Sequence, residues 1–282
     1  MATPFNDRWV KAGHRDWSEI RLANNQLDFK LNRPAQQQFD NFQDACDFNA
    51  QRLHEDWNDR PLYLALTGGM DSECSATTLV RNRIPFTPFI LEVDELNAYE
   101  VWYAKYWCWK NSITPIVERI TQDQIVDIYK ENINVVRQTN QYGAVTVVHI
   151  LDRVKAMGGY CITSAGDLYM HDTEKYFYTN AIDYPSNVFR TDEHPTAFFT
   201  YTPEIVLSYV LQFNLELDWQ YNKCQFYGCA HRPKADYIRP IRYNDRMEKM
   251  IRLFRGKTPG TQPFVFGTKQ QTIDFLLGKQ TA

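Results

Sequence analysis

Short apolar runs alternate with helix-compatible segments along the first part of this 282-residue chain. Four runs have the length of buried strands: 62–66, 86–93, 113–120 and 160–163. Helices are predicted before and between them: 39–57, 74–83, 98–111, 121–129 and 145–156. Strands that alternate with helices predict a parallel sheet with ligands bound outside the carboxyl ends of its strands. The expected fold class is therefore α/β and Rossmann-like.

Two further segments flank this alternating region. Residues 18–32 alternate around Ala23-Asn24-Asn25-Gln26, which predicts a small hairpin because Asn tolerates the positive φ of tight turns. Beyond residue 176 prolines interrupt Tyr- and Phe-rich segments, although 203–213 has a helical pattern. We expect three parts: an N-terminal hairpin and extension (1–38), an α/β domain (39–175) and a substrate-facing, mostly helical extension (176–282).

The first strand ends in a loop suited to binding phosphate. Its sequence is Thr67-Gly68-Gly69-Met70-Asp71-Ser72, and a helix follows at once. The glycines let the backbone approach an anion, and the N–H groups of the first helical turn lack intrahelical partners. Thr67 and Ser72 add hydroxyl donors, and Asp71 can hold the Mg²⁺ that accompanies a nucleotide. The loop lacks the final Lys of G-x-x-x-x-G-K-[ST], so that motif is excluded.

These six residues resemble the S-G-G-x-D-S signature of the PP-loop ATP pyrophosphatase superfamily (adenine nucleotide alpha hydrolase-like), with Thr67 in place of the first Ser. The resemblance implies that ATP is cleaved between its α- and β-phosphates, with Mg²⁺, to activate a substrate as an adenylate. Asp71 and Ser72 would then be catalytic, and Asp71 would also bind the metal. Thr67, Gly68, Gly69 and Ser72 would cradle the pyrophosphate.

The strand predicted at 160–163 also leads into a short turn with an acidic residue, Ser164-Ala165-Gly166-Asp167, at the same predicted edge of the sheet. This segment resembles, in shorter form, the S-G-E-G-A-D-E segment of the synthetase domain of asparagine synthetase. By that resemblance Ser164 and Gly166 contact the nucleotide, and Asp167 is a second metal ligand. A plain Gly-Asp turn is the alternative interpretation.

Two other expectations follow from the resemblance. Leu91 and Val93 lie at the end of the second strand, where this superfamily meets adenine, although a role in the core is equally open. A basic side chain further along should neutralise the departing pyrophosphate. Lys234 is the first candidate, followed by Arg239 and Lys257, although most residues in such a basic run only solvate a helix face.

Composition narrows the classes of partner. The net charge of −3 gives no overall attraction to nucleic acid. Local basic patches could still bind it, so a nucleic-acid partner stays open. Six widely spaced cysteines are typical of free thiols in a reducing compartment. The N-terminal residues have no signal-peptide pattern and no apolar run approaches a membrane span. We expect a soluble, cytoplasmic protein without a membrane partner.

The expected function is that of an ATP-dependent ligase, nearest to the synthetase domain of asparagine synthetase over about residues 40–170. Its small-molecule substrate would carry a carboxylate or a nucleobase. Position 2 is Ala2, where glutamine-dependent asparagine synthetases carry a catalytic Cys, so ammonia would come free or from a separate donor, or another amine would replace it. Two alternatives remain: a PP-loop enzyme modifying a nucleobase or tRNA (7-cyano-7-deazaguanine synthase-like or thiolation-like), and a non-catalytic nucleotide-binding module.

Overall fold

The computed structural model describes residues 9–13, 28–94, 96–132, 143–164, 168–171, 173–179, 194–217, 219–228 and 264–279. Within these residues, five parallel strands form the main sheet in the order β5-β4-β3-β6-β9. The strands are β3 (Leu62–Ala65), β4 (Thr87–Val93), β5 (Ile116–Ile120), β6 (Tyr160–Thr163) and β9 (Thr196–Ala197).

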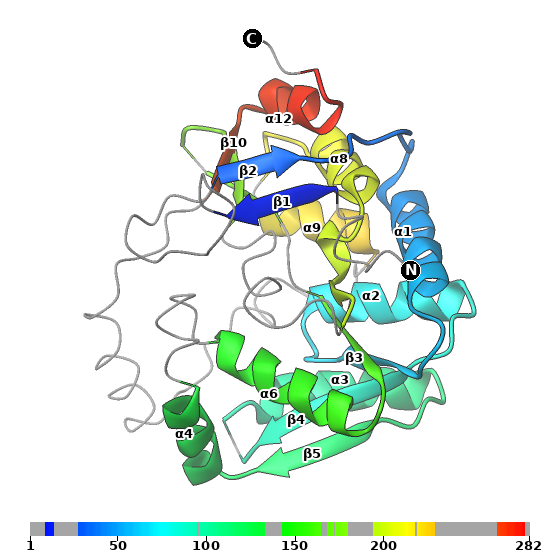
Figure 1. Ribbon diagram of the computed structural model, residues 1–282, viewed down its shortest axis with the longest axis vertical. Helices are drawn as coiled ribbons and strands as arrows, with labels where there is room; N and C mark the ends of the chain where they lie inside the picture. The colour runs from blue at the N-terminus through cyan, green and yellow to red at the C-terminus, as the bar shows by residue number, and fades with distance from the viewer. Residues whose placement is uncertain are drawn as a thin grey trace.

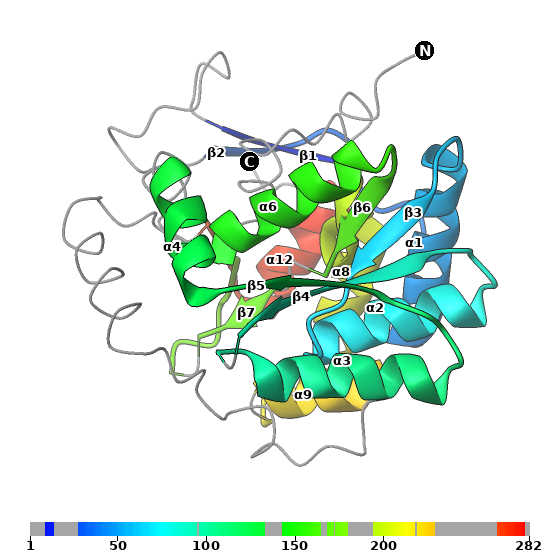
Figure 2. The same cartoon turned by 90° about the horizontal axis from the view of Figure 1, so that it is seen from below.

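The order of the strands places helices on both faces of the sheet. The chain adds β4 and β5 on one side of β3, through α2 (Met70–Arg81) and α3 (Ala98–Lys110). It then returns to the other side of β3, through α4 (Gln122–Glu131) and α6 (Gly143–Ala156). Right-handed crossovers therefore put α2 and α3 on one face and α4 and α6 on the other, as Figure 2 shows. The predicted Rossmann-like α/β fold is confirmed.

Burial explains why these residues form the central strands. All four residues of β6 are buried, and so are all residues of β4 except Thr87 and Glu92. Alternate residues of β4 enter different core clusters: Ile90 joins the cluster that includes helices α2 and α3, while Phe89 and Leu91 join the cluster of α4 and α6. Strands covered on both faces need continuous apolar runs, which is the pattern that the sequence shows.

Helices from before and after the central strands pack beside this sheet. Helix α1 (Phe42–Asp56) precedes β3 in the chain. Helices α8 (Pro203–Gln212) and α9 (Trp219–Tyr227) pack against α1 (Figure 1). The described residues beyond 176 are mostly helical, as predicted, and include η2 (Phe198–Thr200) and α12 (Lys269–Leu276). They also supply β9 to the main sheet, so this part of the chain continues the α/β core. The proposed divisions at residues 38 and 175 stay predictions.

Two small antiparallel sheets complete the described structure. In the first, β1 (Val10–Gly13) pairs with β2 (Asp28–Leu31) at the N-terminal end of the chain. The predicted turn at residues 23–26 lies outside the described residues. The second sheet joins β7 (Tyr169–Met170), β8 (Phe177–Thr179) and β10 (Phe264–Gly267). No described helix is long and apolar enough to cross a membrane.

A buried carboxylate joins the segment before α1 to α8. The Glu204 side chain is only 1% exposed and accepts hydrogen bonds from both terminal nitrogens of Arg33, at 3.0 and 3.2 Å. It also accepts one from the backbone N–H of Gln36, at 3.1 Å. Because a buried charge is stable only when paired, this contact fixes where α8 lies against the segment before α1.

We predict that Glu204→Ala lowers the free energy of unfolding by about 2–3 kcal/mol, because it leaves the Arg33 guanidinium and the Gln36 N–H without their acceptor. Urea unfolding measures this. The control is Glu55→Ala, which removes an exposed partner of Arg52 and should cost less than about 1 kcal/mol. Equal, small losses for both variants would contradict the structural role of Glu204.

Candidate functional site

The loop between β3 and α2 depends on the absence of a side chain at Gly68. This residue has φ +88°, in the left-handed region, and its backbone lies against the first turns of α3. A Cβ there would overlap the carbonyl oxygen of Glu100. Gly69 is extended (φ −78°, ψ 164°) and is the N-cap of α2, where a Cβ would have room. The two glycines therefore have different roles: Gly68 allows the loop to pack closely on α3, and Gly69 is the N-cap of α2.

Two hydroxyl side chains close the loop on itself. The Ser72 Oγ lies 3.1 Å from the Thr67 Oγ1 and accepts from the Thr67 backbone N–H at 3.2 Å. It also donates to the carbonyl oxygen of Gly69, at 3.0 Å. Ser72 is buried while Thr67 is exposed, so Thr67 is the more accessible of the two residues. The catalytic role of Ser72 stays a prediction, and the structure gives its side chain a role in holding the loop.

The end of β6 reaches the same loop, as the sequence predicts for parallel neighbours. The Ser164 Oγ lies 2.9 Å from the Ser75 Oγ, which in turn donates to the carbonyl oxygen of Asp71 at 3.0 Å. The two strand ends thus meet at the first turn of α2, at the point where the strand order reverses. Gly166 and Asp167 lie outside the described residues.

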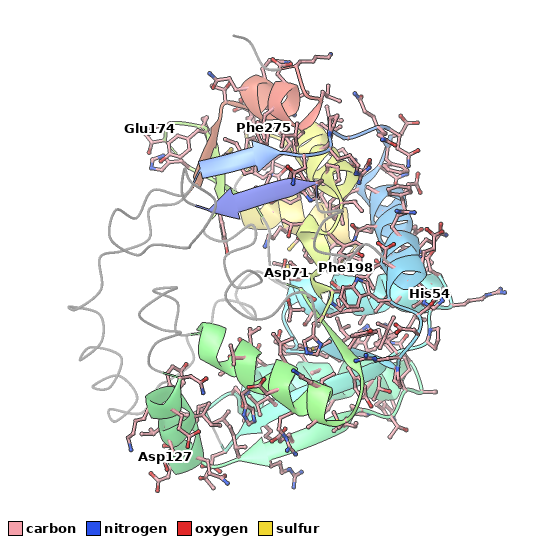
Figure 3. The ribbon with its side chains drawn as sticks, viewed as in Figure 1. His54, Asp71, Asp127, Glu174, Phe198 and Phe275 are labelled. Carbon is pink, nitrogen blue, oxygen red and sulfur yellow. The ribbon has the colours of Figure 1, made fainter. Side chains whose placement is uncertain are left out.

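A buried lysine faces the acid of the loop. Asp71, labelled in Figure 3, lies in the first turn of α2, and its Oδ1 accepts a hydrogen bond from the Nζ of Lys223 at 3.0 Å. The Lys223 side chain is 2% exposed and the Asp71 side chain 34% exposed. The Nζ also lies 5.9 Å from the ring centroids of Tyr169 and Tyr227. A cation buried this deeply requires its carboxylate partner.

Sequence reasoning missed Lys223. The three basic candidates named above, Lys234, Arg239 and Lys257, all lie outside the described residues. Lys223 belongs to α9, and it is the one charged residue in that helix, whose sequence is WQYNKCQFY. A single charge within an otherwise uncharged, aromatic helix was the available signal, because Lys is seldom fully buried unless it is paired.

A cavity of about 210 Å³ lies beside the loop, on the α4 and α6 face of the sheet. Thr67 is in its wall, and so are Leu91 and Val93, the two residues predicted to meet adenine. The remaining lining residues come from β3 and the residue after it, from β4, α3, α4 and α6, and from the segment before α3: Ala65, Leu66, Phe89, Leu96, Asn97, Glu100, Ile125, Tyr129, Thr146 and Ile150. The walls are mainly apolar and include a few polar side chains, which is typical of a small-molecule site.

Glu100 is a second residue that sequence reasoning missed. It lies in the first turn of α3, lines the cavity, and is partly buried. Burial raises the pKa of its carboxyl group above the ordinary value. A carboxyl group with a raised pKa in a cavity is a common feature of functional sites, so Glu100 joins the candidate residues.

The residues at the loop fit a magnesium ion that arrives with phosphate. Mg²⁺ typically takes one or two protein carboxylates and completes its shell with phosphate oxygens and water. The partly exposed carboxylate of Asp71 can be one such ligand. The described residues contain no group of three or more His, Cys, Asp or Glu side chains that could hold a metal by themselves. The predicted second ligand, Asp167, lies outside them.

The sequence matches no known protein family and no curated protein. The structure is similar to that of an NMN synthetase from Francisella tularensis, with a TM-score of 0.41, 15% identity, and coverage of 86% of this chain and 88% of that one. It is also similar to an NH₃-dependent NAD synthetase from Campylobacter jejuni, with a TM-score of 0.37, 16% identity, and coverage of 77% and 95%. At such low scores these likenesses carry no argument about activity.

We predict that Gly68→Ala destabilises the protein strongly. An L-residue in the left-handed region costs about 1–2 kcal/mol, and the overlap with the Glu100 carbonyl adds to this. Gly69→Ala is the matched control and should cost about 1 kcal/mol or less, as the loss of an N-cap glycine. Urea unfolding of both variants measures the difference. Similar losses for the two would show that the loop does not pack on α3 as described.

We predict that Glu100→Gln stabilises the protein at pH 8 more than at pH 4. Because the folded protein raises the pKa of Glu100, ionisation opposes folding above that pKa, and this penalty disappears as the pH falls below the unfolded-state value. Glutamine has no such ionisation. The measurement is the difference in thermal midpoint between wild type and variant across this pH range. A difference that does not change with pH would contradict the burial of an ionised Glu100.

Proposed function

We propose that this chain is an enzyme that binds ATP with Mg²⁺ and cleaves it to AMP and pyrophosphate while adenylating a substrate, as in the PP-loop ATP pyrophosphatase superfamily. One observation carries the proposal: the loop before α2 has Thr67 in the wall of a mainly apolar cavity and leads into Asp71, which pairs at 3.0 Å with the buried Lys223 of α9. Such a site offers an anion-binding end and a base-binding end at the carboxyl edge of a parallel sheet.

The two ends suit the two halves of a nucleotide. The base would lie in the cavity against Leu91 and Val93, and the phosphates would lie toward Thr67 and the start of α2. The positive end of the α2 dipole stabilises negative charge at that position. Thr67 connects the halves, since it belongs both to the loop and to the cavity wall.

In the proposed reaction, a substrate carboxylate oxygen forms a bond to the α-phosphorus while the bond between that phosphorus and the α,β-bridging oxygen breaks. Pyrophosphate leaves with the electron pair of that bond. The positive charge of Lys223 stabilises the negative charge that develops on the departing pyrophosphate. The loop holds the phosphates so that the attacking and leaving oxygens are in line. Mg²⁺, when bound at Asp71, would supply further neutralisation of phosphate charge.

The second half-reaction is proposed to be amide formation, similar to that of asparagine synthetase. An adenylated carboxylate reacts with an amine without any nucleophilic side chain, because AMP is already a good leaving group. Ammonia, free or from a separate donor, is the proposed nitrogen source. A nucleobase or tRNA substrate would use the same ATP site, so the choice between these acceptors belongs to experiment.

The test is to incubate the protein with ATP and Mg²⁺ and to follow AMP and pyrophosphate. Separate reactions contain carboxylic acids with ammonia, nucleobases, or RNA. Release of pyrophosphate with the first panel supports amide formation, while release with the second or third supports a modifying enzyme. Formation of ADP and phosphate would refute cleavage between the α- and β-phosphates. Binding of ATP without release in any panel would indicate a non-catalytic module.

We predict that Asp71→Asn and Lys223→Met each lower the rate of pyrophosphate release by about 100-fold or more, since each removes a preorganised charge at the phosphates. Asp71→Asn should also lower the stability strongly, because it removes the carboxylate that pairs with the buried Lys223, whereas Lys223→Met should cost less, because the carboxylate that it leaves is partly exposed. The double variant should regain part of this stability while remaining inactive. Rate measurements and urea unfolding of all three variants separate the two effects.

The control is Asp47→Asn, which breaks the ion pair of Asp47 with Arg81 at the far end of α2. Its turnover should equal that of the wild type even though its stability falls. Full turnover of Asp71→Asn would remove Asp71 from the mechanism.

A further inference from the structure

One edge of β4 extends beyond its neighbour at the cavity. The β3–β4 pairing ends at Ala65 and Phe89, and the last backbone hydrogen bond runs from Leu66 N–H to the carbonyl oxygen of Phe89 at 2.9 Å. Beyond this point β4 continues to Val93. Since backbone groups alternate between the two neighbours of a parallel strand, the Leu91 carbonyl and the Val93 N–H point to the side that β3 has left.

A side chain takes up these two groups. The Asn97 Oδ1 accepts a hydrogen bond from the Val93 N–H at 2.9 Å, and the Asn97 Nδ2 donates to the Leu91 carbonyl at 2.8 Å. All three residues line the cavity. Asn97 thus satisfies the unpaired end of the strand edge with a single primary amide.

The Asn97 side chain does not cap the helix that it precedes. It occupies the N-cap position of α3, where Asn usually accepts a hydrogen bond from an N–H of the first turn. Here it makes no such side-chain bond. In contrast, Asn41 at the start of α1 caps its helix in the usual way, by accepting from the Asp44 N–H at 2.8 Å. The side chain of Asn97 is therefore turned away from its helix and toward the cavity wall.

A primary amide and an adenine ring offer the same pattern to such an edge. The amide presents an acceptor oxygen next to a donor NH₂ group. Adenine presents the acceptor N1 next to its 6-amino donor, whereas hypoxanthine presents the reverse pattern, a donor at N1 and an acceptor at position 6. We infer that the Asn97 amide occupies the place at which this protein reads the base edge, so that an adenine ring reaches Leu91 and Val93 only by displacing Asn97.

This inference rests on the proposed function, because it requires the base of a nucleotide to enter this cavity. It assigns to Asn97 control over both affinity and selectivity for the base. Adenine exchanges two hydrogen bonds of Asn97 for two of its own, so the edge contributes little net affinity in the wild type. Removal of the competing amide should strengthen the binding of adenine nucleotides and should give hypoxanthine nucleotides no such gain.

The test measures the Kd of ATP and of ITP by calorimetry, with Mg²⁺ and without an acceptor substrate. The first variant is Asn97→Ser, because a serine hydroxyl caps α3 in the usual way and does not reach the strand edge. We expect its Kd for ATP to fall by about tenfold, the equivalent of roughly one net hydrogen bond, with an unchanged Kd for ITP. Asn97→Ala should give the same increase in selectivity with a less stable helix start.

Asn41→Ser is the matched control, and it should leave both Kd values unchanged. Weaker ATP binding in both Asn97 variants, or an equal change for ATP and ITP, would overturn the inference and would make Asn97 a structural residue of the segment before α3. If the wild type and all variants bind neither nucleotide, the proposed function fails, and the inference falls with it. Wild-type release of pyrophosphate together with unchanged selectivity in the variants would overturn only the role of Asn97.

Discussion

The close approach of the Gly68 backbone to the first turns of α3 is the contact on which the site depends. It fixes the direction in which the chain leaves β3, and so it fixes where α2 begins and where Asp71 lies. The same turn of α3 carries Glu100, which lines the cavity. A single backbone contact therefore sets both the loop and one wall of the cavity. Any side chain at position 68 would separate them, because close-packed interiors do not absorb an added methyl group without displacement.

Charge provides the second constraint, and it acts over a long distance in sequence. Lys223 and Asp71 are 152 residues apart, yet the buried ammonium of one requires the carboxylate of the other. This pair draws α9, from beyond the central strands, onto the start of α2. The described part of the chain after residue 176 thus contributes β9 to the sheet, beside β6, and Lys223 to the site. In the proposed reaction these opposed charges would already be in place when a phosphate binds, which is the condition for electrostatic preorganisation.

The sequence predicts those features of the fold that local periodicity determines. The central strands and helices follow because continuous apolar runs and amphipathic segments are local signals, and the loop at Gly68 follows from its residues. The features that it leaves unpredicted depend on tertiary contacts. No local pattern joins Lys223 to Asp71, and β9 is only two residues long, so its place beside β6 depends on pairing alone. Glu100 was predicted only as part of a helix, since its raised pKa comes from burial.

Asn97 illustrates the same limit at a single position. Asn is a common N-cap residue, and Asn97 does stand at the start of α3, but its side chain bonds to β4 instead of to its own helix. The reason is that β4 extends beyond β3, which leaves the Val93 N–H and the Leu91 carbonyl without a strand partner. Buried backbone groups need hydrogen-bond partners, and Asn97 supplies them. Strand lengths therefore decide what the side chain does. Because Asn97, Glu100 and the contact of Gly68 all belong to the start of one helix, the same helical turn lies at both the proposed base end and the proposed phosphate end of the site. The proposed base selectivity and the proposed phosphate chemistry thus depend on the same helical turn, so a substitution in that turn is expected to change both.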